Sequence, residues 1–445
     1  MSRELGIARL NRPSLWLAII ALGLSGLTVA GPALHAHTGD WALIAIFGLG
    51  AIGAFRAAQL GELADQRHAL ALILIGAAAM RVALLFTEPT LSTDIYRYVW
   101  DGRVQAAGIN PYRYVPAAPE LAPLRDGAIW PLINRADYAV TIYPPVAEAL
   151  FLAITRVGES VVVMKLALLA FEAASVAAII GLLNRLAIPP TRIAAYAWHP
   201  LPIWEIAGNG HVDAAMIAFL LVSVLVFLNG RVLLGGVLAT LGALIKPTAL
   251  LALPVFWRPW DWRLPLAMVA TIAIAYLPYL SVGSGVLGFL GVYIEEEGFR
   301  EGSGFRIVWL IEQLTGPLPL AGPLYAALAA VILASMALVV GFRSDRSSSA
   351  AIRGLNWLLI AFLVLTTPHY PWYFLALAPF LALYPTATSW TLTTASVLLH
   401  FVHDGAWVPG YSARFAAFTL AMLAALAYDL WSECRKTLRP AGDTP

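Results

Sequence analysis

The stretch "LALILIGAAAMRVALLF" (Leu70–Phe86) decides the fold, because an apolar run of this length with a single charge is typical of a membrane helix. It is followed closely by "STDIYRYVWDGRVQAAGINPY" (Ser92–Tyr112), which is rich in ionisable and aromatic residues. The whole chain has 445 residues, of which 60% are hydrophobic and 12% are charged. A soluble chain carries about twice that charged fraction. The composition therefore predicts an integral membrane protein.

Further apolar runs predict an all-α, polytopic fold with about 13–14 transmembrane helices. A long polar segment, 88–142, follows the third helix. A second outer loop, 282–318, follows the candidate helix 264–281. We expect one integral membrane domain, 1–445, with a polar tail at 433–445. The candidate helices are 14–31, 41–55, 69–87, 161–184, 192–207, 212–229, 231–246, 264–281, 320–342, 352–367, 371–386, 389–403 and 411–432, with 247–257 as a half-length crossing.

The distribution of basic residues predicts the orientation in the membrane. Arg56, Arg185, Arg231 and Arg343 all fall between helices on one side, which the positive-inside rule makes cytoplasmic, together with both termini. The net charge is only +2, and scattered basic residues give no indication of a nucleic-acid partner. The single cysteine, Cys434, excludes an intramolecular disulfide. The opposite, outer face should collect five polar segments, namely 88–142, 207–213, 244–248, 293–306 and 366–373.

The first outer loop is predicted to start as a short amphipathic helix. Ser92 and Thr93 are suitable caps for a helix that begins near Asp94. Helical spacing places Asp94 and Asp101 on one face, with Arg97 beside them. A carboxylate partly desolvated at the membrane surface could act as a general base. The alternative is that Asp94 only stabilises the helix N-terminus and pairs with Arg97, and spacing alone leaves both interpretations open.

An ordered series of motifs resembles a known family. The motifs are "TDIYRYVWDGRVQAAGINPY", "IYPPVAEAL", "HPLPIWEIAGNGHVDAAM", "LIKPTALLALPVFW" and "PHYPWYFLALAP". Together they resemble the GT-C superfamily of membrane glycosyltransferases, and most closely the bacterial polyprenyl-phosphate-mannose-dependent mannosyltransferases and the related glycosylphosphatidylinositol mannosyltransferases. The resemblance runs from Leu70 to Pro385, so the helices within 1–68 look like an addition to the family's usual core.

This resemblance implies an enzyme that moves a hexose, mannose by analogy, from a polyprenyl-phosphate donor to a glycan or glycolipid hydroxyl, with inversion, on the extracytoplasmic face. It implies Asp94 as the catalytic base, and Asp101 is the reserve candidate. The twin-acid pattern often found at this site is replaced here by "STD", so we expect no metal and no cofactor.

The remaining candidate residues follow from the needs of that reaction. Cationic groups must hold the lipid phosphate, and the candidates are Lys246, Arg306, His369, His211 and Arg81. Stacking and hydrogen-bonding groups must orient the sugar, and the candidates are Asn209, Tyr370, Trp372 and Tyr373.

Several of these residues also have a structural interpretation. The whole role of His211 could be to cap the following helix, and that of His369 could be to form hydrogen bonds at the membrane interface. Arg81 lies inside the third helix and could extend outward to water. The acidic run Glu295–Glu297 is interpreted as solvated surface.

Two other function classes share these features. A secondary transporter or lipid flippase would also contain buried ionisable residues and broken helices, but such folds usually show paired breaks in two related halves. The sequence shows one break, at Lys246-Pro247, which favours an enzyme. A polymerase of lipid-linked oligosaccharides would use the same donor class on the same face. We expect a bacterial inner-membrane location, membrane-lipid contacts and a periplasmic active face.

Overall fold

The structure is a computed structural model that describes residues 12–400, 402–403, 406–407 and 411–438. Residues 1–11 of the predicted N-terminal segment and 439–445 of the predicted tail lie outside it. The only strands in the described part are β1 (Val402–His403) and β2 (Ala406–Trp407), which pair antiparallel. All other regular elements there are helices, so the predicted all-α class is confirmed.

Eight segments in the described ranges are long and apolar enough to cross a membrane. They contain α1 (Arg12–Thr38), α2 (Asp40–Leu63), α3 (Gln66–Leu85), α6 (Val161–Arg185), α12 (Arg263–Tyr276) with its extension to Glu296, α15 (Ala321–Gly341), α16 (Ser348–Thr366) and α19 (Tyr411–Leu438). Shorter apolar helices lie between them, including α9 (Asp213–Leu228) and α10 (Val232–Ala243). A polytopic membrane fold is therefore confirmed, and the number of crossings stays a prediction.

Three segments predicted as continuous helices are broken into short pieces. Where 192–207 was expected, the chain forms η3 (Pro190–Ile193), α7 (Ala194–Ala197), α8 (Pro200–Pro202) and the π-helical η4 (Ile203–Gly208). Where 371–386 and 389–403 were expected, it forms η7 (Pro371–Leu377), α17 (Phe380–Leu383), α18 (Ala387–Ala395) and η8 (Ser396–Leu399), followed by strand β1.

Proline explains these breaks. Pro200, Pro202, Pro371, Pro379 and Pro385 all interrupt the apolar runs, and each removes a backbone donor from the helical ladder. Irregular backbone at membrane depth is tolerated only where protein covers it. The residues from Ala194 to Gly210 are buried throughout, so the broken segments form the centre of the molecule and the long helices surround them.

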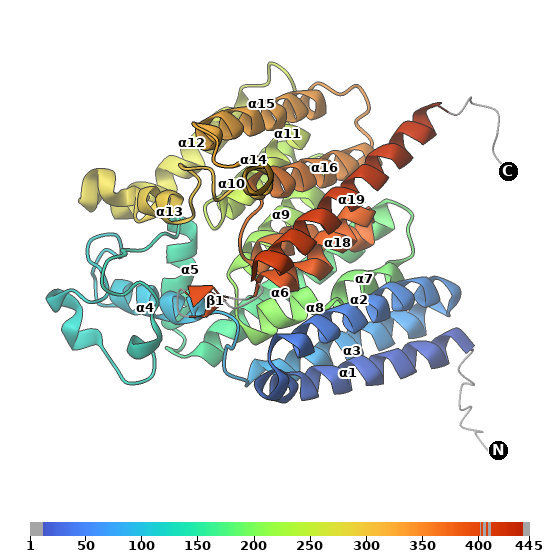
Figure 1. Cartoon of the computed structure of the whole chain (residues 1–445), viewed down its shortest axis with the longest axis horizontal. Coiled ribbons are helices and arrows are strands. Elements are labelled where there is room, and N and C mark those ends of the chain that lie inside the picture. Colours follow the sequence, from blue (N-terminus) through green and yellow to red (C-terminus); the bar gives the residue numbers. More distant parts are fainter. Residues whose placement is uncertain (1–11, 401, 404–405, 408–410, 439–445) are drawn as a thin grey trace.

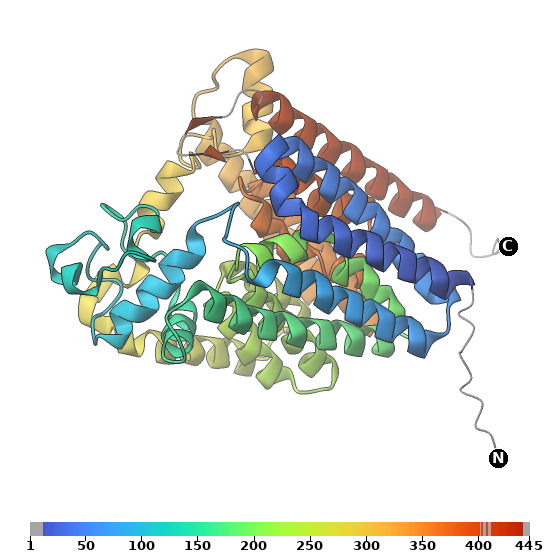
Figure 2. The same ribbon diagram turned by 90° about the horizontal axis from the view of Figure 1, so that it is seen from below.

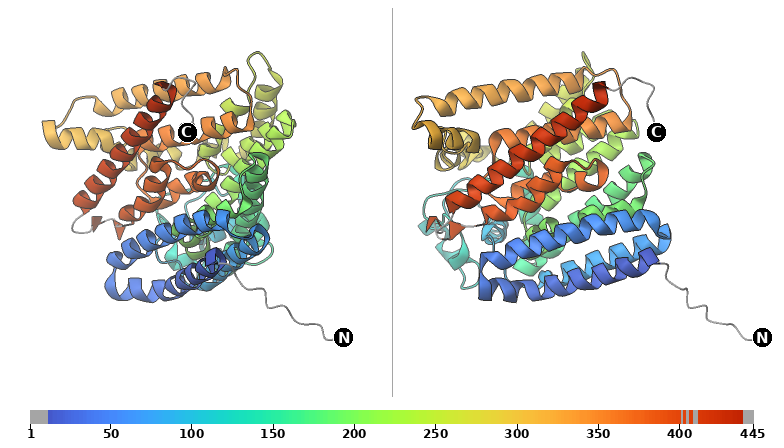
Figure 3. Two further views of the ribbon diagram at one scale, coloured as in Figure 1. Left: turned by 90° about the vertical axis from the view of Figure 1, so that its right-hand side faces the viewer. Right: turned by 45° about the vertical axis from the view of Figure 1, so that its right-hand side comes forward.

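The molecule has two distinct ends. The long helices run towards the end where the N- and C-terminal helices α1 and α19 begin and finish, as Figures 1 and 3 show. The opposite end carries α4 (Asp94–Ala106), α5 (Pro145–Thr155) and α13 (Leu290–Glu296). Figure 2 shows the loop between α4 and α5 projecting beyond the long helices. We call this the α4 end.

The five polar segments predicted to converge do meet at the α4 end. The backbone N–H groups of Thr90 and Leu91 donate to Asn209, which joins the first segment to the second. The N–H of Val146, just beyond the first outer loop, donates to the carbonyl of Leu244. Contacts between Lys246 and Asp213, Tyr293 and Tyr373, and Glu297 and His369 connect the others. The predicted convergence is therefore confirmed.

Helix α4 begins at the predicted residue. The N–H of Asp94 donates to Ser92 Oγ at 3.2 Å, so Ser92 supports the first turn as expected, whereas Thr93 makes no side-chain cap. Helix α5 crosses α4 closely at Gly102, where an added Cβ would lie 2.5 Å from the Phe151 carbonyl oxygen. This contact explains why a glycine occupies the middle of an otherwise bulky helix.

Candidate active site

The Asp94 carboxylate lies at the first turn of α4 and is half-buried. Asn134, from the loop between α4 and α5, donates to Asp94 Oδ1 at 2.9 Å. Tyrosines surround this carboxylate, and its charge acts on the hydroxyls of Tyr143 and Tyr370. Burial raises the pKa of Tyr370, and the nearby Glu297 and Asp94 carboxylates raise it further. Asp94 therefore sits among neutral hydroxyls with one fixed amide partner.

A cation and an acidic partner form a second wall of the site. Lys246, directly before the break at Pro247, places Nζ 2.6 Å from Asp213 Oδ2. The same Nζ lies 5.0 Å from the centre of the Tyr373 ring. The Tyr373 hydroxyl is 2.8 Å from that of Tyr293 on α13. The charges of Asp94 and Asp213 both act on the Tyr373 hydroxyl, so this ring lies near both carboxylates.

An aromatic stack continues from this wall. The rings of Tyr370 and Trp372 are stacked at 4.6 Å, and Trp372 stacks on His211 at 4.3 Å. Flat aromatic faces of this kind can hold the apolar face of a sugar. His211 is fully buried, with Nε2 3.2 Å from Glu205 Oε2, and the other oxygen of Glu205 lies 2.6 Å from His400 Nε2. His211 therefore contacts the site through Trp372.

Asp101, seven residues after Asp94 on the same helix, has a different environment. It is only 2% exposed, and Arg97 Nε donates to its Oδ1 at 2.8 Å. Burial raises the pKa of Asp101, and the Arg97 charge opposes that rise. Glu148 on α5 is equally buried, and burial beside Asp101 raises the pKa of this carboxyl well above its usual value. Asp101 thus belongs to an interior network that joins α4 to α5.

Two other predicted phosphate ligands are held by internal partners. Arg306, the first residue of α14 (Arg306–Thr315), is fully buried and donates to the backbone oxygens of Thr367 and Pro368. His369 Nδ1 lies 2.8 Å from Glu297 Oε2. Glu297 is 8% exposed, so the interpretation of the whole acidic run as solvated surface is wrong for this member, because it is buried against His369.

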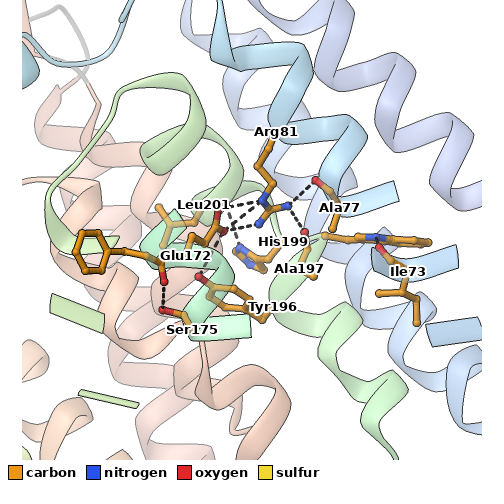
Figure 4. Close-up of polar contacts among 11 residues, drawn as sticks. Ile73, Ala77, Arg81, Glu172, Ser175, Tyr196, Ala197, His199 and Leu201 are labelled. Atoms are coloured by element: carbon orange, nitrogen blue, oxygen red, sulfur yellow. Dashed lines mark hydrogen bonds and ion pairs between the residues drawn. The ribbon is translucent and has the colours of Figure 1, made fainter. Parts of the chain in front are cut away.

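Arg81 lies in the interior of the long helices, as Figure 4 shows. Its Nη2 is 2.6 Å from Glu172 Oε1 on α6, and its Nη1 donates to the carbonyls of Ala77 and Ala197. Tyr196 donates to the same Glu172 carboxylate at 3.4 Å. The side chain does not extend outward to water, because its partners lie on α3, α6 and α7.

Both polar atoms of the Asn209 side chain form hydrogen bonds with backbone groups. Its Oδ1 accepts from the N–H groups of Thr90 and Leu91, and its Nδ2 donates to the Trp204 carbonyl. The next residue, Gly210, has φ +71°, and an added Cβ would lie 2.2 Å from Ile95. The "GNG" turn therefore presses directly on the start of α4, and Asn209 fixes the chain just before Asp94.

Several residues of the site could not be found from sequence. Asn134 and Arg135 lie in a loop without periodicity, and only their contacts reveal them. Glu205 and Glu172 lie inside apolar runs, and an ionisable residue at membrane depth is a usable signal for such buried partners. Among the residues of known placement, no three His, Cys, Asp or Glu side chains gather in a way that could hold a metal ion.

The fold and this site define a polytopic membrane protein with a partly accessible carboxylate, a cation and stacked aromatic rings at one end. A family model described as "Alpha-(1->6)-mannopyranosyltransferase, N-terminal domain" matches residues 14–260, which is more than half of the chain. The chain belongs to this mannosyltransferase family, and the predicted resemblance is confirmed at that level. The match includes α1 and α2 as well as Asp94, Asn134 and Lys246.

One curated relative supports the same family. Alpha-(1->6)-mannopyranosyltransferase A of Mycobacterium tuberculosis (strain ATCC 25618 / H37Rv) is 25% identical over 323 residues, which cover 65% of this chain and 61% of the relative. The chain therefore spans about three fifths of the length of the curated relative it matches. No solved structure matches the chain significantly.

Proposed function

We propose that this chain is a membrane mannosyltransferase of the GT-C type, which transfers mannose from a polyprenyl-phosphate donor to a hydroxyl group of a glycan or glycolipid. The family membership and the name of the mycobacterial relative support mannose and make an α-(1→6) linkage the first to test. The basic flanks of the helices at the opposite end support a bacterial inner membrane with an extracytoplasmic site and cytoplasmic termini.

The observation that carries this proposal is the accessibility of Asp94. It is a half-buried carboxylate that starts a helix at the α4 end, whereas Asp101 is committed to Arg97. The Asn134 amide holds Oδ1 and so orients the carboxylate. A base must reach the acceptor hydroxyl in the reacting complex, and of the two carboxylates Asp94 has that access.

The reaction is a single displacement. The acceptor oxygen attacks the anomeric carbon of the donor sugar, Asp94 takes its proton, and the bond from the anomeric carbon to the phosphate oxygen breaks. The polyprenyl phosphate leaves with the bonding electrons. Attack opposite to the leaving group inverts the configuration at the anomeric carbon.

Lys246 is the side chain best placed to stabilise the leaving phosphate. Its Nζ lies beside Tyr373, and a cation at that position offsets the negative charge of the bound phosphate and the further charge that develops as the bond breaks. Tyr370, the outer ring of that stack, supplies a face for the sugar, and Trp372 supports it from behind because His211 covers the other face of the indole. Because side chains alone can provide this charge, we expect transfer to persist when divalent ions are removed with a chelator.

The test is transfer in membranes that contain the full chain, supplied with radiolabelled polyprenyl-phosphate mannose, polyprenyl-phosphate glucose or a soluble nucleotide-linked mannose. An α-(1→6)-linked oligomannoside is added as acceptor, and membranes without the chain are the control. Label should pass to the acceptor from polyprenyl-phosphate mannose. Transfer only from the soluble nucleotide donor contradicts the donor class. Movement of the labelled lipid across the bilayer without transfer identifies a transporter instead.

A further inference from the structure

Arg135 has an unusual backbone conformation next to the residue that holds Asp94. It lies in the loop between α4 and α5, directly after Asn134, and its φ is +53°. A non-glycine residue in this left-handed region is uncommon, and such conformations gather at functional sites. The loop therefore presents two neighbouring side chains to the site, and one of them already contacts the proposed base.

The Arg135 guanidinium faces the same aromatic wall as Lys246. It lies 5.9 Å from the centre of the Tyr293 ring, and the Tyr293 hydroxyl contacts that of Tyr373. Lys246 lies over the other member of this tyrosine pair. The hydroxyl of Tyr370 interacts with both Arg135 and Asp94. Two cations thus flank one pair of tyrosine rings beside the proposed base.

The partner of Arg135 is an exchangeable one. Its Nε donates to Glu296 Oε2 at 3.0 Å, and the two side chains are 31% and 29% exposed. Ion pairs with this access to water contribute little free energy, so another anion can replace the carboxylate at small cost. Arg306, by contrast, is fully buried and its guanidinium is bonded to backbone oxygens, so no ligand can take over those contacts without unfolding the region.

We propose that Arg135 binds the phosphate of the lipid donor and that Glu296 is its competitor in the empty site. This inference rests on the proposed function for the identity of the donor. A guanidinium presents paired donors that match phosphate oxygens, which makes arginine a better phosphate ligand than lysine here. Donor binding exchanges the Glu296 carboxylate for the phosphate and releases the end of α13 from the loop that carries Asn134.

The competition predicts that substitutions of Arg135 and of Glu296 change the affinity for the donor phosphate in opposite directions. Removing Arg135 takes away a charge-assisted contact to the phosphate and should weaken binding about tenfold or more. Replacing Glu296 with a neutral side chain removes the competitor and should strengthen binding by up to about fivefold. A pair that only fastened α13 to the loop would respond in the same direction to either change.

The experiment measures binding of a polyprenyl phosphate without sugar to the purified full chain in nanodiscs, by native mass spectrometry, and the matching prenol is the control ligand. The variants are Arg135→Ala, Arg135→Lys and Glu296→Gln. Matched controls are Arg300→Ala and Glu295→Gln, because that neighbouring pair is 74% and 50% exposed and Glu295 precedes Glu296 on α13. Thermal unfolding of each variant shows whether it is folded.

The expected order of affinity for the polyprenyl phosphate is Glu296→Gln above wild type, then wild type, then Arg135→Lys, then Arg135→Ala. The control variants should bind as wild type does, and the prenol should not distinguish any of them. Weaker binding in Glu296→Gln, or unchanged binding in a folded Arg135→Ala, overturns the proposal. The result is separable from the proposed function, because binding of the phosphate requires no sugar transfer. If the chain binds polyprenyl phosphate through Arg135 but transfers no sugar, the proposed transferase function is refuted and the phosphate site at Arg135 stands.

Discussion

The ion pair of Arg135 with Glu296 at the α4 end and the ion pair of Arg81 with Glu172 inside the long helices are built from the same residue types but differ in access to water. Arg135 and Glu296 are 31% and 29% exposed, whereas Arg81 and Glu172 are 9% and 3% exposed. Arg81 also donates a hydrogen bond to the Ala77 carbonyl, and Figure 4 shows Arg81 enclosed by these partners. The outer pair has one hydrogen bond between two side chains.

This difference separates charges that fix the fold from charges that are available to a ligand. A buried charge that loses its partner is left unsolvated, so the interior pair must stay intact for the helices to pack. A charged side chain that is about one-third exposed can change partners, because water solvates it while it is between the old partner and the new one. Lys246, with 13% exposure and a buried Asp213 partner, lies between these extremes.

The largest effect should come from breaking the interior pair with Glu172→Gln. The substitution leaves the Arg81 charge without its carboxylate, which should cost about 3–5 kcal/mol of folding free energy. Thermal unfolding followed by size-exclusion chromatography measures this loss. The double variant Arg81→Met with Glu172→Leu should recover most of it. If Glu172→Gln folds normally but loses donor binding, Arg81 is a donor ligand and the comparison fails.

An intermediate effect is expected at Lys246. Lys246→Met should raise the KM for the lipid donor about tenfold, because a charged contact to the phosphate is lost. It also leaves Asp213 without its cation, so the matched variant is Lys246→Met with Asp213→Asn, which removes both charges. We expect the double variant to fold as wild type does and to keep the high KM. Recovery of the KM in the double variant would mean that Lys246 only neutralises Asp213.

The smallest effect is a dependence on pH in the first outer loop. The Arg103 side chain and the N–H groups of Ile129 and Trp130 bond to Asp126, and although partial burial opposes them they lower its pKa to about 2. A carboxyl with a lowered pKa stabilises the fold above its unfolded pKa of about 4, and this contribution is lost as the pH falls towards the folded value.

The size of this contribution is limited because Asp126 is 36% exposed. Solvent screening should keep it below about 1 kcal/mol. Unfolding of wild type and Asp126→Asn should differ slightly at neutral pH and converge in acid. A difference that grows as the pH falls would contradict the assignment.

Composition and apolar run length were enough to predict the membrane class and most of the long helices, because these features depend on single segments. The start of α4 at Asp94 was also predictable, since Ser92 provides a local signal that the structure confirms. The broken segments around Pro200 and Pro371 were not recognised. Their apolar composition satisfied the length rule, and only burial by surrounding helices makes their irregular backbone acceptable.

The candidate site was predictable in its location but not in its partners. The outer segments do converge, and Asp94, Lys246 and Trp372 lie in them as expected. Sequence spacing could not show that Arg306 is bonded to the backbone of Thr367. It also could not reveal Arg135, because a loop without periodicity gives no information about which side chains its fold brings together.

The most direct test of the central claim is the rate of mannose transfer by Asp94→Asn and Asp101→Asn in the full chain, normalised to folded protein. The account predicts that Asp94→Asn loses about 10²–10⁴-fold in kcat with an unchanged unfolding temperature, because only the base is removed. Asp101→Asn should instead unfold at a lower temperature and retain most transfer per folded molecule. An active Asp94→Asn, or a folded but inactive Asp101→Asn, would contradict the assignment of Asp94 as the base.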